Sequence, residues 1–160
     1  MVVERIDVSG MESAVTPARP RIVYVVTEDW YFWSHRLDLA RAARDAGFDV
    51  TVATGVTDHG ERIRAEGFTL VPLALVRRSR NPLQEVNAVS QLVRLYRSVR
   101  PHVVHHVAMK PILYGSLASW IVGVPVVINA FAGLGYTFTQ ERIKLLRWSI
   151  KGCLKAMVKL

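Results

Sequence analysis

The sequence predicts an α/β fold in which a Rossmann-like, doubly wound parallel sheet carries helices on both faces. Short apolar runs rich in β-branched residues alternate with longer amphipathic segments. The runs lack the apolar and polar alternation of half-solvated strands, as expected for parallel strands that are covered on both sides. Short connections between the segments favour right-handed crossovers. With 160 residues, 51% of them hydrophobic, the chain is long enough for one domain and too short for two ordinary ones.

Five apolar runs are expected to form the strands of the sheet. They are Arg21–Val26, Asp49–Thr54, Phe68–Leu75, His102–Val107 and Val124–Phe131. Pro72 cannot donate a backbone hydrogen bond to a neighbouring strand, so the third run is expected at an edge of the sheet.

Helices are expected between these strands because capping and stop signals flank each amphipathic segment. Ser34 is expected to cap a helix that ends at Gly47, and Asp58 and Glu61 have capping-box spacing for a short helix. The remaining helices are expected over 82–99, with Val86 among the residues of its apolar face, over 111–122, and from about 139 to the last residue.

Composition excludes several classes of protein. A single cysteine, Cys153, rules out an internal disulfide framework and a cysteine-rich zinc site, and it indicates a reducing compartment. Residues 1–20 contain three acidic residues and no apolar core, so we expect a disordered leader and not a secretory signal. Since the longest apolar segments are shorter than the ~18 residues of a membrane span, we do not expect an integral membrane protein.

Positive charge is concentrated in the last nineteen positions of a chain whose net charge is +8. Its basic residues there are Arg142, Lys144, Arg147, Lys151, Lys155 and Lys159, with no acidic residue among them. A basic amphipathic helix that contains Trp148 suits an anionic membrane surface. A helix that packs on the sheet and exposes its basic side explains the pattern equally well, and both readings stay open.

The candidate functional residues follow the strands of the expected sheet. Ligands of such sheets bind beyond the carboxyl ends of the strands. The fourth run ends at His105 and His106, and Lys110 follows at a helix start. Because neighbouring residues of a strand point to opposite faces, at most one of the two histidines is expected to face a ligand, and His106 is favoured. The competing interpretation is a hydrogen-bonded structural histidine and a solvated turn lysine.

Three other loops are expected to reach the same edge. They contribute Trp30, His35 and Arg36 after the first strand, Arg77, Arg78 and Arg80 after the third, and Gly133 and Gly135 after the fifth. Basic side chains next to helix N-termini predict an anion site for phosphate or diphosphate. The turn after the first strand has no glycines, which disfavours a nicotinamide or flavin dehydrogenase.

Three stretches together resemble the N-terminal domain of family 4 glycosyltransferases. They read "VTEDWYFWSHRLDLARAARDAGFDVTVAT", "RRSRNPLQEV" and "RPHVVHHVAMKPILYGSLASWIVGVPVVINAFAGLGYTF". The similarity is greatest to the bacterial branch that acts on undecaprenyl-linked sugars in polysaccharide and glycan assembly. It implies one half of a GT-B fold, in which an N-terminal domain takes the acceptor and a C-terminal domain binds most of the nucleotide-sugar. Residues 21–160 would be the N-terminal domain, truncated inside its last helix, with the donor-binding domain absent.

The resemblance also implies roles for the candidate residues. It places His105, His106 and Lys110 in the motif that faces the donor sugar and its diphosphate, as the catalytic candidates. It places His35 and Arg36 in the "SHR" that opens the first helix. Gly133, Gly135 and Tyr136 belong to the "GLGY" loop that lines the cleft. The sequence departs from the family where "EDWYFW" replaces paired glycines and where Val107 replaces a second histidine that many relatives have.

The function that this resemblance implies is retaining transfer of a hexosyl or amino-sugar group from a nucleotide-sugar to a lipid-linked or glycan acceptor. No metal and no cofactor besides the nucleotide-sugar donor is expected, and no nucleic-acid partner. The enzyme would be cytoplasmic and peripheral on the inner face of the cell membrane, held there by Arg142–Lys159. The isolated fragment is expected to be inactive. The alternative is a non-catalytic interaction domain associated with the membrane surface.

Overall fold

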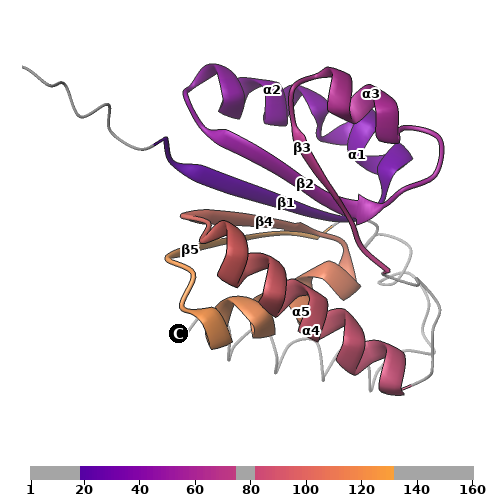
Figure 1. Ribbon diagram of the computed structural model, residues 1–160, viewed down its shortest axis with the longest axis vertical. Helices are drawn as coiled ribbons and strands as arrows, with labels where there is room; N and C mark the ends of the chain where they lie inside the picture. The colour runs from indigo at the N-terminus through magenta and orange to yellow at the C-terminus, as the bar shows by residue number, and fades with distance from the viewer. Residues whose placement is uncertain (1–18, 75–81, 132–160) are drawn as a thin grey trace, which may run out of the picture.

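The computed structural model describes residues 19–74 and 82–131, which form one parallel sheet with helices on both faces (Figure 1). The strands are β1 Arg21–Glu28, β2 Asp49–Gly55, β3 Thr69–Pro72, β4 Val103–Val107 and β5 Val126–Ala130. Their order in the sheet is β3-β2-β1-β4-β5, and each neighbouring pair is parallel. The predicted fold class is confirmed, and so is the edge position of the strand that contains Pro72.

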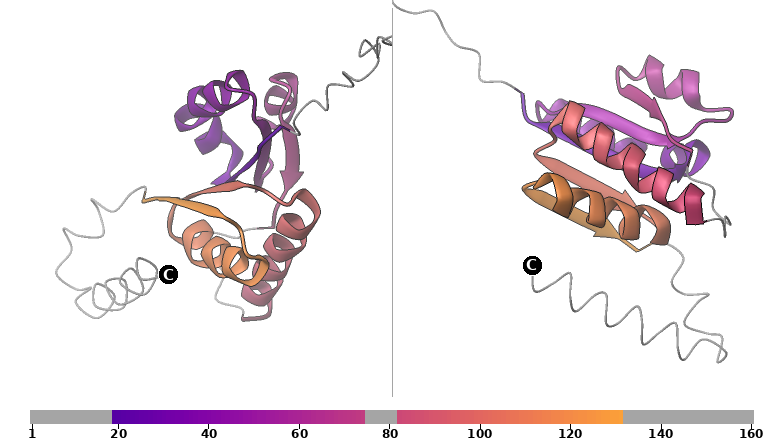
Figure 2. Two further views of the ribbon diagram at one scale, coloured as in Figure 1. Left: turned by 90° about the vertical axis from the view of Figure 1, so that its left-hand side faces the viewer. Right: turned by 60° about the horizontal axis from the view of Figure 1, so that its bottom comes forward.

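Five helices cover the sheet within these residues. They are α1 Asp29–His35, α2 Leu37–Asp45, α3 Gly60–Ala65, α4 Pro82–Val99 and α5 Met109–Val122. Figure 2 shows α1, α2 and α3 on one face and α4 and α5 on the other. We call these the α1–α3 face and the α4–α5 face. None of the described helices is long and apolar enough to cross a membrane.

The apolar strands are explained by two hydrophobic cores, one on each face. Along β1, Tyr24 packs into the core under α1, α2 and α3, while Val23 and Val25 pack into the core under α4 and α5. A central parallel strand therefore has no solvated side, and this removes the polar alternation from its sequence. On β4 the same alternation sends His105 to the α1–α3 face and His106 to the α4–α5 face, because they pair with Tyr24 and Val25 of β1.

The segment after β1 differs from the prediction. Helix α1 already begins at Asp29. The helical conformation is interrupted at Arg36, and α2 begins at Leu37. Ser34 is therefore not a helix cap, since it lies inside α1 and its hydroxyl donates to the carbonyl of Trp30 at 2.9 Å. The burial of Phe32 in the core and of Asp29 at the helix start hold α1 in position. These two positions do not produce a helical period that could be recognised in this aromatic stretch of the sequence.

Two smaller predictions about the helices are also wrong. The capping box of Asp58 and Glu61 does not form; His59 is the N-cap of α3 without a side-chain hydrogen bond, and Glu61 instead pairs with Arg64 at 2.6 Å. Helix α4 begins at Pro82 as predicted, but Val86 is 65% exposed. The buried face of α4 consists of Ala88, Leu92, Leu95 and Tyr96. The predicted leader and the predicted terminal helix lie outside the described residues.

Candidate functional site

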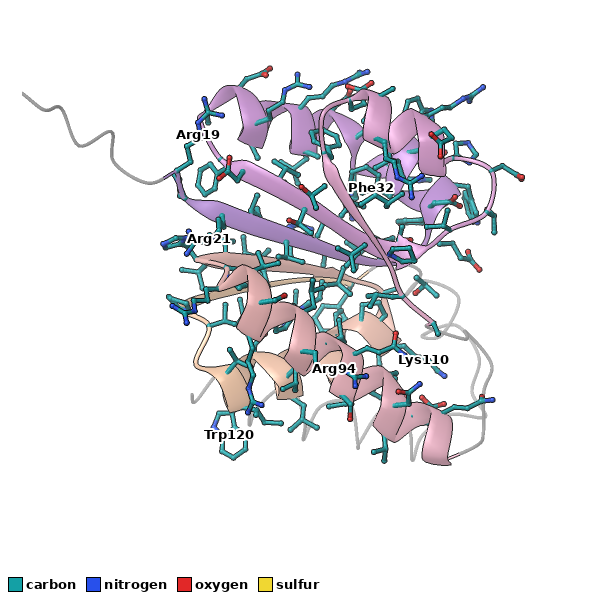
Figure 3. The ribbon with its side chains drawn as sticks, viewed as in Figure 1. Arg19, Arg21, Phe32, Arg94, Lys110 and Trp120 are labelled. Atoms are coloured by element: carbon teal, nitrogen blue, oxygen red, sulfur yellow. The ribbon has the colours of Figure 1, made fainter. Side chains whose placement is uncertain are left out.

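The candidate residues that the structure describes come from β4, α1 and the first turn of α5. Figure 3 shows Lys110 at the end of the molecule where the strands finish, while Arg19 and Arg21 mark the opposite, amino end. This carboxyl edge is where ligands of parallel sheets bind. The geometry of each side chain there decides what it can contact.

His106 is fully enclosed on the α4–α5 face. Its ring nitrogens lie 2.8 Å from the hydroxyl of Tyr96 and 2.8 Å from Oδ1 of Asn129. Since that amide oxygen accepts, Nδ1 carries the proton and Nε2 accepts from Tyr96. Burial lowers the pKa of His106 to about 4, so the ring is neutral near pH 7. Gly115 makes room for it, because a Cβ at that position would lie 2.4 Å from Nε2. The contacts of His106 are those of a structural histidine.

His105 lies on the α1–α3 face, where its ring packs against Tyr24 with centroids 5.2 Å apart. Only 7% of the residue is exposed, yet its Nε2 is buried without a hydrogen-bond partner among residues 19–74 and 82–131. Burial, and next the charge of Arg36, lower the pKa of His105. Of the two histidines, His105 is the one with a ring nitrogen that has no partner in the described residues, whereas the sequence favoured His106 as the one that faces a ligand.

Arg36 lies close to His105, at the break between α1 and α2. Its Nη1 donates to the carbonyl of His35 at 2.9 Å, but its Nε is buried and has no partner in the described part of the chain. Burial raises the pKa of Tyr24 to about 12, and the charge of Arg36 opposes this rise. The structure thus brings together two predicted residues, His105 and Arg36, each with an unsatisfied buried nitrogen.

Lys110 belongs to the other face of the sheet. Its Nζ lies 2.8 Å from Oε1 of Glu85 in the first turns of α5 and α4. The hydroxyl of Tyr114 donates to the second oxygen of Glu85. Burial, together with Glu85, raises the pKa of Tyr114 to about 12. Lys110 can therefore meet the His105 and Arg36 pair only around the carboxyl edge of β4, and its predicted catalytic role remains a prediction.

Several rings of α1 form a partly exposed surface at the carboxyl end of β1, while Phe32 is buried in the core. Trp30 is 43% exposed, and its indole nitrogen donates to Oε2 of Glu28 at 2.9 Å, which fixes the ring plane. His35 is exposed and stacks on Tyr31 with ring centroids 4.3 Å apart. These rings are available for contact with an apolar or planar ligand surface.

Asp29 organises this edge, and its partners could not be inferred from the sequence. The side chain is fully buried and accepts four hydrogen bonds: from the amide and hydroxyl of Thr57 at 2.7 and 2.6 Å, from the amide of His59 at 2.9 Å and from the amide of Trp30 at 2.8 Å. Burial raises the pKa of Asp29, but these hydrogen bonds outweigh it and hold the pKa below its ordinary value. An acid directly after a buried strand is the only signal that the sequence offers.

Several predicted residues lie outside the described residues: Arg77, Arg78, Arg80, Gly133, Gly135, Tyr136 and the basic segment Arg142–Lys159. No group of three or more histidine, cysteine, aspartate or glutamate residues is placed to hold a metal ion in the described ranges. Glu85 is a residue that the sequence did not single out, whereas Asp29 was expected at this edge without its partners.

Comparison with known proteins gives one family and a set of similar folds. The model of a family described as "Glycosyl transferase 4-like" matches residues 21–160. The search of curated proteins found no significant sequence match. A glycosyltransferase from Rickettsia africae ESF-5 superposes with a TM-score of 0.60 and 15% identity over 71% of this chain and 30% of that chain. The glycosyltransferase VinC in complex with DTDP superposes with a TM-score of 0.50 and 20% sequence identity, over 68% of this chain and 34% of that chain.

A UDP-N-acetylglucosamine 2-epimerase shares the fold as well, with a TM-score of 0.57 and 16% identity over 81% of this chain and 38% of that chain. Similarity at such low identity establishes the Rossmann-like α/β fold and nothing about chemistry. The chain spans about a third of the length of these solved structures, since it covers 30%, 34% and 38% of them. The glycosyltransferases and the epimerase share this fold, and the match to the family model is what assigns the chain to the glycosyltransferases.

Proposed function

The chain belongs to the glycosyl transferase 4-like family, and from that premise we propose that it forms the acceptor-side half of a retaining glycosyltransferase. The enzyme moves a hexosyl or amino-sugar group from a nucleotide-sugar to a lipid-linked or glycan acceptor. The single observation that carries the proposal within this chain is the pair of buried, unsatisfied nitrogens of His105 and Arg36.

An unsatisfied buried donor costs about 1–3 kcal/mol, and a ligand that pairs with it recovers this free energy. Because the pKa of His105 is lowered below its ordinary value, its ring is uncharged near pH 7. Its Nε2 therefore suits a neutral hydroxyl group such as that of a sugar. The guanidinium of Arg36 suits a phosphate or carboxylate oxygen. Together they match the sugar and the phosphate of a nucleotide-sugar.

Positive charge at the carboxyl edge supports departure of the diphosphate leaving group. When the bond between the anomeric carbon and the diphosphate breaks, negative charge develops on the departing phosphate oxygen. Besides Arg36, the described groups that can stabilise this charge are Lys110 and the N-terminus of α5. Arg77, Arg78 and Arg80, and the loop that contains Gly133, Gly135 and Tyr136, are proposed to complete the cleft. The proposal requires no metal and no further cofactor.

The acceptor is proposed to lie against Trp30 and Tyr31 of α1. These two rings are partly exposed and present apolar faces that can stack on a sugar ring. The basic residues of Arg142–Lys159 are proposed to hold the enzyme on the anionic inner face of the cell membrane, where a lipid-linked acceptor is found. No observation favours the alternative of a non-catalytic membrane-surface domain.

The proposal is tested by a transfer assay with radiolabelled nucleotide-sugars. The chain is assayed alone and joined to the donor-binding domain of a family member. We expect transfer with retention of anomeric configuration from the joined protein and none from the chain alone, because the donor would lose most of its contacts. Full activity of the 160 residues alone would contradict the shared cleft.

A matched pair of variants locates the site in the same assay. His105→Gln is expected to lower kcat/KM of the joined protein about 100-fold, as loss of a transition-state contact does. His102→Gln is the control, because His102 lies at the amino end of the same strand, where its Nδ1 accepts from the amide of Arg21. Equal activity of the two variants would remove His105 from the site.

A further inference from the structure

Glu85 is the acidic residue in the first turn of α4, and its carboxylate reaches across to the first turn of α5. One oxygen accepts from Lys110 and the other from Tyr114. The Lys110 and Glu85 side chains are 22% and 25% exposed, so the ion pair is partly shielded from water. An ion pair in such surroundings is stronger than one on an open surface.

The position of Lys110 is not explained by the stability of α5. A cation in the first turn of a helix meets the positive end of the helix dipole, which is unfavourable. Helix α5 has no acidic residue in its own first turn to offset this charge. The compensating charge comes from α4, through Glu85. The side chain of Lys110 also lies over the ring of Tyr114, with Nζ 5.9 Å from the ring centroid.

We propose that Glu85 is the built-in counter-ion of Lys110, which competes with the phosphate group of the substrate for the ammonium and so sets the anion affinity of this edge. The inference rests on the proposed function, in which Lys110 stabilises a diphosphate. A phosphate oxygen that approaches Lys110 also approaches the carboxylate of Glu85. Binding then requires the ammonium to exchange one anionic partner for another, which weakens ground-state binding and favours release of the product.

Tyr114 gives the exchange a defined geometry. Its hydroxyl stays protonated throughout the neutral pH range, because its pKa is raised to about 12. It continues to donate to Glu85 when Lys110 turns towards a phosphate. The carboxylate is therefore held in place as a fixed negative charge, and the lysine is the group that moves between the two anions.

The variant Glu85→Gln tests this role because it removes the charge and keeps the size of the side chain. Its one oxygen can accept from Lys110, and its amide nitrogen can donate to the hydroxyl oxygen of Tyr114. The probe is inorganic diphosphate, titrated at constant ionic strength into the 160-residue chain and followed by two-dimensional NMR of the backbone amides. We expect Glu85→Gln to bind diphosphate about tenfold more tightly than the unmodified chain, since an adjacent unit charge of the same sign is removed.

Glu66→Gln is the matched control. Glu66 is also a paired carboxylate, bound to Arg41 and Arg44 by charged contacts at the end of α3 and remote from Lys110. Its replacement changes the net charge by the same amount and should leave diphosphate affinity within about twofold, because Glu66 lies on the other face of the sheet and dissolved salt screens charges far from the site. Thermal unfolding of both variants verifies that each is folded under the conditions of the titration.

The outcomes separate this inference from the proposed function. Equal affinity of Glu85→Gln and Glu66→Gln, weaker binding by Glu85→Gln, or no binding by any variant overturns the counter-ion role. Lys110→Gln should weaken binding in both the unmodified and the Glu85→Gln chain. If Lys110→Gln weakens binding while Glu85→Gln behaves like the control, the inference fails and the proposed role of Lys110 stands. If Glu85→Gln tightens binding and Lys110→Gln has no effect, both the inference and the proposed role of Lys110 fail.

Discussion

At the scale of single residues, two neighbouring histidines of one strand have opposite environments. His106 fills a polar niche in the core, with both ring nitrogens bonded, while His105 has a buried nitrogen without a partner in the described structure. Strand β4 thus supplies one histidine whose ring nitrogens are satisfied within the protein and one that we propose contacts a ligand. Alternation along the strand predicts that they differ, but only their neighbours decide which is which.

The burial of His106 predicts a pH dependence of stability. Its pKa in the folded protein, about 4, lies below its ordinary value of 6.5, so the unfolded chain binds a proton more readily. This histidine therefore leaves the free energy of unfolding unchanged above about pH 6.5. Between pH 6.5 and pH 4 it lowers the free energy of unfolding by about 3 kcal/mol in total, and below pH 4 the loss levels off. His105 adds to this loss in the same direction.

Urea unfolding of the unmodified chain and of His106→Asn between pH 7 and pH 4 measures this contribution. The variant is expected to be less stable at pH 7 but to lose clearly less stability on acidification. Parallel pH profiles for the two proteins would show that His106 does not titrate as its burial requires.

The close contact between Gly115 and the ring of His106 leads to a second prediction at the scale of residues. Replacement of Gly115 by alanine places a Cβ 2.4 Å from the ring of His106, and the ring has no free space because Tyr96 and Asn129 hold it. We expect Gly115→Ala to lower the free energy of unfolding by about 1–3 kcal/mol despite the better helix propensity of alanine. Urea denaturation measures it, with Ser90→Ala on the exposed side of α4 as the control. A variant as stable as the parent would contradict the tight fit.

At the scale of elements, α1 depends on a contact with the loop between β2 and α3. Asp29 joins the two through its bonds to Thr57 and His59. This contact fixes the start of α1, and with it the orientation of Trp30 and the position of Arg36 at the end of the helix. The surface that is proposed to take the acceptor is thus set by one buried carboxylate.

Asp29→Asn is therefore expected to destabilise the chain by about 2–4 kcal/mol, because its amide nitrogen would face backbone donors. Urea denaturation gives the magnitude, and hydrogen exchange at the amides of Thr57 and His59 locates the effect. Asp38→Asn, at an almost fully exposed side chain in the first turn of α2, is the control and should change little. Unchanged exchange at Thr57 would contradict the joining role of Asp29.

The sequence predicted the elements better than their contacts. Each strand was predictable because a parallel strand with two covered faces is apolar throughout, and Pro72 marked the edge. Helix α1 was missed because four successive aromatic residues give no helical period. Thr57 and His59, which bind Asp29, and Glu85, which binds Lys110, lie about 25 residues or more away along the chain, so no local pattern indicates these contacts.

At the scale of the whole molecule, the chain gathers His105, Arg36 and Lys110 at the carboxyl edge of the sheet and carries a basic segment in its last nineteen residues. The family match covers the sheet, both helical faces and the basic segment. Because the solved structures of similar fold are about three times as long, we propose that catalysis requires this surface together with a second domain.

The basic segment predicts binding to anionic vesicles. Replacing Arg142, Lys144, Arg147 and Lys151 by glutamate should weaken binding by orders of magnitude, since each basic residue near an anionic surface contributes about 1 kcal/mol. Sedimentation with anionic and neutral vesicles measures this, and high salt should weaken the binding of the unmodified chain through screening. Equal binding to neutral vesicles would contradict an electrostatic attachment.

The central claim is that the ligand site at the carboxyl edge includes His105 and excludes His106. NMR of the histidine side-chain nitrogens tests it most directly, with UDP-linked, dTDP-linked and GDP-linked sugars added in turn to the chain near pH 7.5. We expect at least one nucleotide-sugar to shift the Nε2 resonance of His105, while both nitrogens of His106 keep their resonances because Tyr96 and Asn129 enclose the ring. A shift at His106 with none at His105 would contradict the assignment of His105 to the ligand site.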